Sequence, residues 1–226
     1  MSLDARLSNA RPRYARNMSD SSAGAVEHYF SASPAGEFRT AEIQVSLAGH
    51  DITVETSGGI FSPDHVDAGT EALLAHVPSP PVTGNLLDIG CGWGPITLSL
   101  ALESPEATVY AVDVNERARE LTERNARRAG VTNVVVAAPE DVPETVGFDA
   151  IWSNPPIRVG KAELHAIIQA WIPRLNPGAS AFLVVAKHLG ADSFEKWLGT
   201  EFGASHAVSR ATNHKGFRVI EVRAHN

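Results

Sequence analysis

From residue 85 onward, short apolar runs alternate with longer segments in which apolar residues recur at helical spacing. The runs predict strands at 85–89, 108–112, 134–136, 148–152 and 180–185, and two last strands near 205–210 and 217–223. The segments between them predict helices at 95–103, 115–129, 161–174 and 192–198. Apolar strands between amphipathic helices are typical of a parallel sheet covered by helices on both faces. The pattern therefore predicts an α/β, doubly wound fold.

A different pattern precedes this region. Residues 42–47 and 51–56 alternate apolar and polar side chains one by one. Ala48-Gly49-His50 between them predicts a turn, so we expect a β-hairpin over 38–57. A helix is predicted from about 67 to 77, and the proline-rich run that follows is expected to end it.

The first 25 residues are rich in Ser, Arg, Ala and Asp and show no periodicity. We interpret residues 1–25 as a flexible arm. The remaining chain, 26–226, is expected to form one domain, with the hairpin at 38–57 as an accessory and 60–226 as the core.

Composition narrows the function classes. The formal net charge of −7 argues against a protein that binds nucleic acid through bulk positive charge, although a locally basic surface remains compatible with it. A single cysteine, Cys91, fits a reducing cytoplasm. We expect no metal site, because the nine histidines show no recognisable ligand spacing. We expect no membrane span, because no apolar run approaches about 20 residues.

A glycine-rich turn follows the first strand of the core, in Asp88-Ile89-Gly90-Cys91-Gly92-Trp93-Gly94. Glycines at such a turn let a ligand approach the backbone closely. The spacing is G-x-G-x-G, which differs from the G-x-G-x-x-G of dinucleotide sites. Asp88 would repel a pyrophosphate and suits a positively charged ligand, such as the ammonium and sulfonium of S-adenosylmethionine. We interpret Cys91 as a small packed side chain of this loop.

Asp113 ends the second strand, about twenty residues downstream, as expected for an acid that accepts hydrogen bonds from a ribose diol. The alternative role for Asp113 is a helix N-cap, which Asn115 is also able to supply. We count Val114, the next residue, with the cofactor-binding residues.

The fourth strand ends in Ser153-Asn154-Pro155-Pro156-Ile157. Two consecutive prolines fix the backbone and remove two N–H donors, so we expect carbonyls that face a ligand with no neighbouring donor competing. The Asn154 side-chain oxygen and the Pro155 carbonyl would then accept both protons of an –NH2 group. First and fourth strands are neighbours in common doubly wound orders, which would place this loop beside the glycine-rich turn.

These three motifs together resemble the Rossmann-like methyltransferases of the small-domain (MTS) family, which includes ribosomal small-subunit guanine-N2 methyltransferases. The resemblance runs from about residue 40 to the C-terminus. It implies a seven-stranded sheet with an antiparallel last strand and S-adenosylmethionine as cofactor, with S-adenosylhomocysteine as product. The partner it implies is ribosomal RNA or the small ribosomal subunit.

The resemblance also assigns further residues. The segment 59–70 looks like the family's segment that closes over the methionine end of the cofactor, which adds Phe61 to the cofactor-binding residues. On the acceptor side it adds Pro156 and Ile157 as substrate-binding residues. We add Arg158 and Lys161 as substrate-binding residues that would contact RNA phosphates; the alternative for these two is a solvated helix start. Either Glu140 or Asp141 would stand near the adenine. Larger bacterial members carry a second, degenerate domain that we do not expect in this chain.

Three other readings remain open at this stage. Release-factor methyltransferases share the Asn-Pro-Pro loop, so a protein glutamine amide is an alternative acceptor, although Ile157 stands where they have tyrosine. A non-catalytic RNA-binding protein with a vestigial fold is a second alternative. An NAD-dependent dehydrogenase is disfavoured by the glycine spacing and by Asp88.

Overall fold

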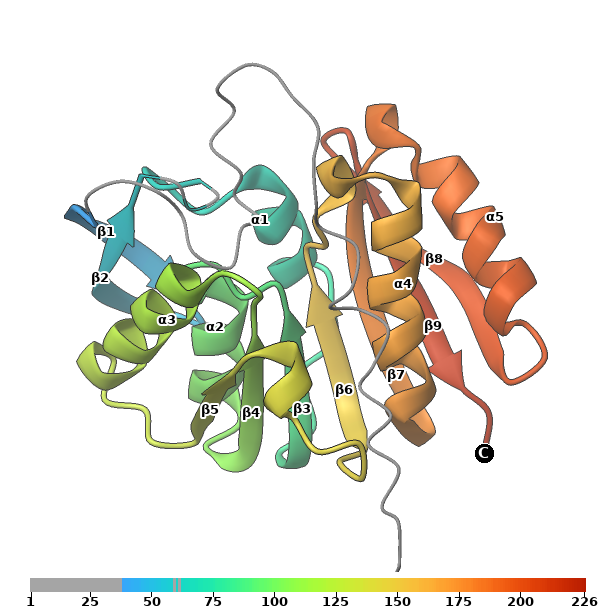
Figure 1. The fold of residues 1–226 in the computed structure, drawn as a ribbon, viewed down its shortest axis with the longest axis horizontal. Helices are drawn as coiled ribbons and strands as arrows, with labels where there is room; N and C mark the ends of the chain where they lie inside the picture. Colours follow the sequence, from blue (N-terminus) through green and yellow to red (C-terminus); the bar gives the residue numbers. More distant parts are fainter. Residues whose placement is uncertain (1–37, 59, 61) are drawn as a thin grey trace, which may run out of the picture.

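A seven-stranded sheet of order β5-β4-β3-β6-β7-β9-β8 forms the centre of the computed structural model, which describes residues 38–58, 60 and 62–226 (Figure 1). Its strands are β3 (Thr83–Ile89), β4 (Glu106–Val112), β5 (Val134–Ala137), β6 (Phe148–Ser153), β7 (Leu175–Ala186), β8 (His206–His214) and β9 (Phe217–Ala224). Strands β3 to β7 pair in parallel, and β9 runs antiparallel to both β7 and β8. The predicted seven-stranded sheet with an antiparallel last strand is therefore confirmed. The predicted arm and Phe61 lie outside the described residues.

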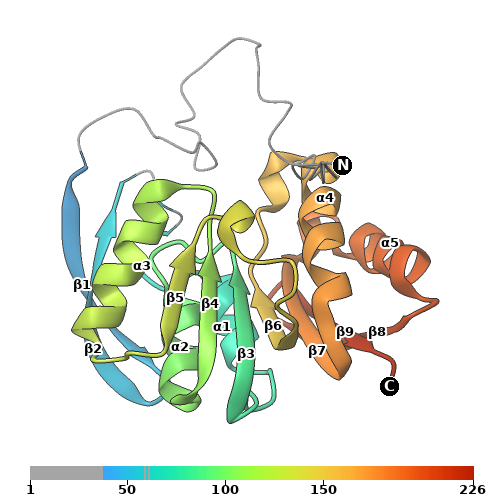
Figure 2. The ribbon, with the colours of Figure 1, turned by 60° about the horizontal axis from the view of Figure 1, so that its bottom comes forward.

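Helices cover both faces of this sheet, as Figure 2 shows in the view turned by 60°. They are α1 (Ala68–Leu74), α2 (Pro95–Glu103), α3 (Glu116–Arg128), α4 (Lys161–Trp171) and α5 (Ala191–Phe202), with short 3-10 turns η2 (Pro139–Asp141), η3 (Ile157–Val159), η4 (Ile172–Arg174) and η5 (Lys187–Leu189). On one face, buried residues of α4 and α5 pack on Leu87, Ile151 and Leu183. On the other, α1 and α2 pack on the residues one position away, such as Leu86 and Trp152. This alternation follows from the two-residue period of a strand.

Some boundaries differ from the predicted ones. Helix α1 begins one residue later than predicted, because Asp67 is its N-cap, and it ends at Leu74, before the predicted end at 77. The helix predicted at 161–174 ends at Trp171 and continues as η4, where Pro173 cannot donate an α-helical hydrogen bond. Helix α5 extends beyond the predicted end to Phe202, whose side chain is buried. No helix of the described residues is long and apolar enough to cross a membrane.

Strands β1 (Thr40–Leu47) and β2 (His50–Ser57) form the predicted hairpin, which lies at the edge of the molecule next to α3 (Figures 1 and 2). Its turn contains only Ala48 and Gly49, both with positive φ (50° and 77°), and His50 already belongs to β2. Two such residues form the turn whose twist matches a tight hairpin. The predicted three-residue turn was therefore one residue too long.

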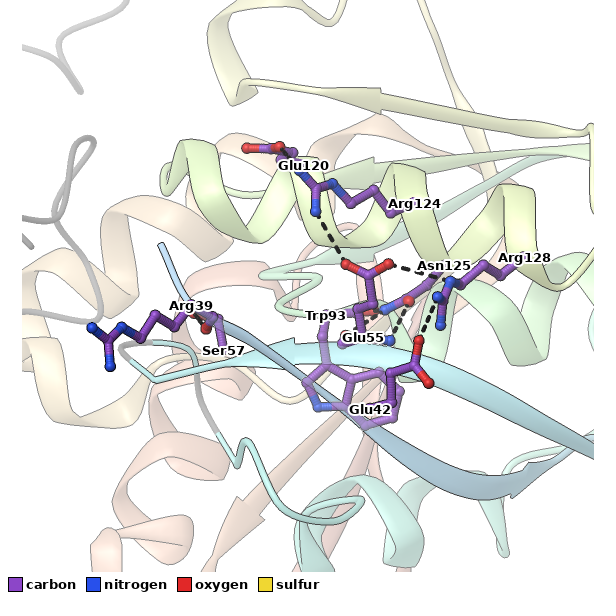
Figure 3. A network of polar contacts seen from close by, with 9 residues as sticks. All are labelled: Arg39, Glu42, Glu55, Ser57, Trp93, Glu120, Arg124, Asn125 and Arg128. Atoms are coloured by element: carbon purple, nitrogen blue, oxygen red, sulfur yellow. Dashed lines mark hydrogen bonds and ion pairs between the residues drawn. The ribbon is translucent and has the colours of Figure 1, made fainter. Parts of the chain in front are cut away.

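A buried asparagine of α3 ties the hairpin to the glycine-rich loop (Figure 3). Asn125 accepts a hydrogen bond from the Glu55 backbone N–H at 2.7 Å and donates to the Glu55 carbonyl at 2.9 Å. It also donates to the Trp93 carbonyl at 2.8 Å. Around it, Arg124 and Arg128 form ion pairs with Glu55. One side chain thus satisfies backbone groups of two segments that lie far apart in the sequence.

Candidate active site

The carboxyl ends of β3 and β6 meet at one edge of the sheet, at the top of Figure 1. Asp88 in β3 pairs with Ala111 of β4 on one side and with Trp152 of β6 on the other. The Ser153 hydroxyl donates to the Ile89 carbonyl at 2.7 Å, which links the two strand ends directly. The predicted juxtaposition of the glycine-rich turn and the Asn-Pro-Pro loop is therefore confirmed.

The glycines of the turn have the backbone that the sequence predicts. Gly90, Gly92 and Gly94 all have positive φ (77°, 60° and 97°), which only glycine adopts without strain. A Cβ at Gly90 would meet nothing within 4 Å, and one at Gly92 would meet only Ile60, at 4.0 Å. At Gly90 and Gly92 the loop therefore presents bare backbone that a ligand is able to approach closely, whereas a Cβ at Gly94 would meet Thr122 Oγ1 at 3.2 Å.

Asp88 also caps a helix, a role that the sequence did not reveal. Its Oδ2 accepts hydrogen bonds from the Thr97 N–H at 3.0 Å and the Thr97 hydroxyl at 2.6 Å. Gly94, the N-cap residue of α2, has no side chain to cap that helix, so Asp88 caps it from the neighbouring strand. Its Oδ1 is buried and has no hydrogen-bond partner among the described residues.

Burial raises the pKa of Asp88 from 3.8 to about 7, against the lowering effect of the two bonds from Thr97. A buried carboxylate oxygen without a donor is costly, and a cation nearby would relieve that cost. Asp88 and the open backbone of the loop therefore fit the methionine end of S-adenosylmethionine, which carries an ammonium and a sulfonium.

Asp113 directly follows β4, and both of its carboxylate oxygens accept hydrogen bonds from backbone N–H groups. Oδ2 accepts from Gly92 N–H at 3.1 Å and Oδ1 from Asn115 N–H at 2.8 Å. Burial raises its pKa, although these bonds oppose the shift. Asn115 is the N-cap of α3, so the alternative role for Asp113 is not the one the structure gives it. Each oxygen keeps a second lone pair, which a ribose diol is able to use. Val114 follows, and its carbonyl accepts a bond from Arg119.

Cys91 is buried, and the Thr122 hydroxyl lies 3.4 Å from its sulfur. Burial raises the pKa of the thiol well above its usual value, with the charges of Asp113 and Asp88 adding to the shift. A neutral buried thiol is a poor nucleophile. These observations support the interpretation of Cys91 as a packed side chain.

The loop carbonyls are held by α3, through residues that the sequence reasoning did not single out. The Thr122 hydroxyl donates to the Gly92 carbonyl at 3.1 Å, next to the bond from Asn125 to Trp93. Trp93 in turn donates its indole N–H to the Ser62 carbonyl at 3.2 Å. A polar residue on the buried side of a helix was the available signal for both Thr122 and Asn125.

Asn154, at the end of β6, has a side-chain amide whose orientation the structure determines. Its Nδ2 donates to Asp67 Oδ2 at 2.8 Å and to Thr70 Oγ1 at 3.1 Å. A carboxylate accepts hydrogen bonds and cannot donate them, so the NH2 end must face Asp67. The Oδ1 end then points away from Asp67 and accepts no hydrogen bond from the described part of the chain. Sequence reasoning placed Asp67 and Thr70 only in a segment near the cofactor, and missed their contact with Asn154.

The backbone after Asn154 corrects one prediction. The Ile157 N–H donates to the Pro155 carbonyl at 2.8 Å, so a neighbouring donor does compete for that oxygen. Pro156 has φ −73° and ψ 76°, the geometry of an inverse γ-turn, which brings the donor of the following residue back to the preceding carbonyl. The Pro155 oxygen therefore has one lone pair left for a ligand.

The other predicted substrate-binding residues lie just beyond this turn. Ile157 is half-buried and packs against the core under α4. Arg158 in η3 and Lys161 at the start of α4 are exposed. Glu140 and Asp141, in η2 after β5, are both exposed, and nothing in their contacts selects one of them. Among the described residues no cluster of His, Cys, Asp or Glu is able to hold a metal ion.

A family model described as "Methyltransferase small domain" matches residues 51–221. The uncharacterized protein YbxB of Bacillus subtilis (strain 168) is 36% identical over 200 residues, which cover 87% of this chain and 98% of that protein.

Longer relatives match over part of their length. Ribosomal RNA small subunit methyltransferase C of Shewanella sp. (strain MR-4) is 34% identical over 169 residues, or 73% of this chain and 48% of that protein. The structure of the T. Thermophilus 16S rRNA N2 G1207 methyltransferase (RsmC), in complex with AdoMet and guanosine, superposes with a TM-score of 0.70 at 25% identity. It covers 84% of this chain and 51% of that one, so the chain spans about half the length of these relatives.

Proposed function

The chain belongs to the methyltransferase small domain family, and we propose that it transfers a methyl group from S-adenosylmethionine to the exocyclic N2 amine of a guanine in small-subunit ribosomal RNA. Two named relatives support this acceptor, since both act on small-subunit ribosomal RNA by their descriptions. The proposal places the protein in the cytoplasm, where the ribosome is.

S-adenosylmethionine supplies an electrophilic methyl group on a sulfonium, and S-adenosylhomocysteine is its product. Of this chain's residues, Asp88 offers a free carboxylate oxygen toward the positive end of the ligand. Gly90 and Gly92, with Cys91 between them, give the loop its approachable backbone, and Gly94 turns the chain into α2. Asp113 and Val114 lie at the next strand end, where the ribose belongs. Phe61 is assigned to the cofactor by the family resemblance alone.

The main observation that supports an amine as the methyl acceptor is the orientation of the Asn154 side-chain amide. Because Asp67 and Thr70 hold its NH2 end, its oxygen is the end available to substrate. An oxygen accepts a hydrogen bond from an amine and repels a carbonyl. The Pro155 carbonyl, which keeps one lone pair, accepts the second N–H of the same amine.

Two acceptors fix the plane of the –NH2 group, whose lone pair is otherwise delocalised into the base. Holding both N–H bonds favours pyramidalisation and directs the lone pair toward the methyl group. Most of the rate then comes from positioning, which is worth several kcal/mol, since a single neutral hydrogen bond contributes only about 1 kcal/mol. No strong general base is needed, because the nitrogen becomes acidic as the methyl group arrives. Pro156 and Ile157 shape the loop, and Arg158 and Lys161 lie where the RNA backbone would pass.

Methyl transfer to defined acceptors tests the proposal. Purified protein with labelled S-adenosylmethionine is offered deproteinised 16S rRNA, small ribosomal subunits and a release factor, and the product nucleosides or peptides are identified by mass spectrometry. We expect N2-methylguanosine in the RNA. Asn154→Ala is expected to bind the cofactor normally and to transfer no methyl group. Methylation of the release-factor glutamine alone would replace the proposed acceptor, and normal transfer by Asn154→Ala would remove the role of Asn154.

A further inference from the structure

Two loops that the proposed function does not use end at the same edge of the sheet as the acceptor loop. β9 runs antiparallel to β7, so Phe217 at its start pairs with Ala186 at the end of β7. The Lys187 N–H donates to the Gly216 carbonyl at 2.8 Å, which holds η5 against the β8–β9 turn. In Figure 1 this turn, the start of α4 and the end of β6 all lie at the top of the sheet. Lys187 and Lys215 therefore project from the edge that carries Asn154.

Five arginines elsewhere in the described residues have carboxylate partners that the exposed cations of this edge lack. Arg124, Arg127, Arg128, Arg210 and Arg218 each form an ion pair with a glutamate or aspartate. Within residues 38–58, 60 and 62–226, none of the cations at the acceptor edge forms such a pair; they are Arg158, Lys161, Lys187 and Lys215, and all four are exposed. Unpaired positive charge thus gathers at this edge in a chain whose net charge is −7.

Asp192, an acid that feels the charge of Lys187, is already compensated by another residue. The pKa of Asp192 lies below its usual value mainly because Arg218 donates a hydrogen bond to it, and the charge of Lys187 adds a smaller effect. Asp192 and Arg218 lie 2.6 Å apart. Arg218, and not Lys187, is thus the ion-pair partner of Asp192 among the described residues.

We propose that Arg158, Lys161, Lys187 and Lys215 form one cationic rim that binds the phosphates of the RNA strand carrying the target base. The inference rests on the proposed function and extends it from the acceptor amine to the strand around it. A nucleotide held with its base at Asn154 has its 5′ and 3′ phosphates on either side of the acceptor loop. Arg158 and Lys161 follow that loop directly along the chain, and Lys187 and Lys215 lie at the same edge of the sheet, at the end of β7 and before β9.

Phosphate contacts of this kind give affinity without sequence preference and make binding depend on salt. For single strands each contact contributes about 0.7 to the slope of log Kd against log salt concentration. Removing two contacts is therefore expected to lower the slope by about 1.4 and to weaken binding roughly tenfold at low salt.

Double substitutions that each remove two positive charges test the cationic rim, and a matched control removes two positive charges elsewhere. The test variants are K187Q/K215Q and R158Q/K161Q, and the control is K196Q/R223Q. The control removes two exposed cations that also lack a carboxylate partner in the described part of the chain, but that lie on α5 and at the other end of β9. Binding of 16S rRNA and of a poly(U) strand is measured by filter retention between about 50 and about 200 mM salt. Cofactor affinity and melting temperature are measured for every variant.

We expect both test pairs to weaken RNA binding and to lower the salt slope, while the control pair stays within about twofold of wild type and cofactor affinity does not change. Equal loss in the test and control pairs would show that total charge matters and would overturn the rim. Unchanged RNA binding in the test pairs would overturn it as well. The proposed function is tested separately, by methyl transfer with the wild-type protein. The cationic rim is tested by the difference in RNA binding between the test pairs and the control pair.

Discussion

Changing the two residues that hold the Asn154 amide would test whether its orientation matters for catalysis. Thr70→Val removes the acceptor at 3.1 Å and keeps the shape of a buried side chain. Asp67→Ser removes the carboxylate at 2.8 Å but leaves a hydroxyl that still caps α1. Neither change touches Asn154 itself. Both leave its amide freer to rotate and to present its NH2 end to the substrate amine.

The expected losses follow from the kinds of bond removed. A neutral hydrogen bond is worth about 1 kcal/mol, so Thr70→Val is expected to lower kcat roughly fivefold. A bond to a charged acceptor is worth about 1.5–3 kcal/mol, so Asp67→Ser is expected to lower kcat by about 10- to 150-fold. Thr70→Ser keeps the hydroxyl and is expected to restore most of the activity.

The assay separates orientation from folding. Steady-state kinetics on RNA give kcat and KM, calorimetry gives cofactor affinity, and thermal melting gives stability. Nuclear magnetic resonance of the ¹⁵N-labelled Asn154 side chain reports both Nδ2 protons, which are expected to exchange slowly with water in wild type and fast in Asp67→Ser. The reasoning is refuted if Asp67→Ser shows fast exchange at Asn154 and yet retains wild-type kcat.

Three further outcomes are expected. Burial raises the pKa of Asp88 from 3.8 to about 7, so its contribution to the stability of the cofactor-free protein is full below about pH 4 and is lost as the pH rises through about 7. A series of melting temperatures against pH should show this decline, and Asp88→Asn should lack it. Gly69→Ala should abolish methyl transfer, because its Cβ would lie 2.8 Å from Asp67 Oδ2 and 3.3 Å from Asn154 Nδ2. The control Gly199→Ala, whose Cβ would meet nothing within 4 Å, should raise the free energy of unfolding by about 1 kcal/mol in urea titrations. Asn125→Ala should cost about 3 kcal/mol or more in the same titrations, because three buried backbone groups lose their partner, and a loss below about 1 kcal/mol would contradict that account.

Periodicity predicted the strands and most helices because both are local patterns. That the Asp88 loop and the Asn154 loop meet was predicted from the strand order that is common in doubly wound folds. The contact between Asp67 and Asn154 joins residues 87 positions apart in the sequence, and no local pattern encodes it. The hydrogen bond between the Ile157 N–H and the Pro155 carbonyl was not predicted for another reason. It depends on the ψ angle of Pro156, and proline fixes φ but leaves ψ free.

The reversed direction of β9 sets the order in which the site is completed during synthesis. In an all-parallel sheet, only loops that follow strands reach the carboxyl edge, but here the segment that precedes the last strand reaches it too. A chain emerging from the ribosome finishes its glycine-rich turn more than a hundred residues before Lys215 and Phe217. Phe217 also approaches the position of a Cβ at Gly69 to 3.1 Å, beside Asn154. A growing chain that has not yet reached Phe217 therefore already contains the cofactor loop, but its acceptor side is incomplete.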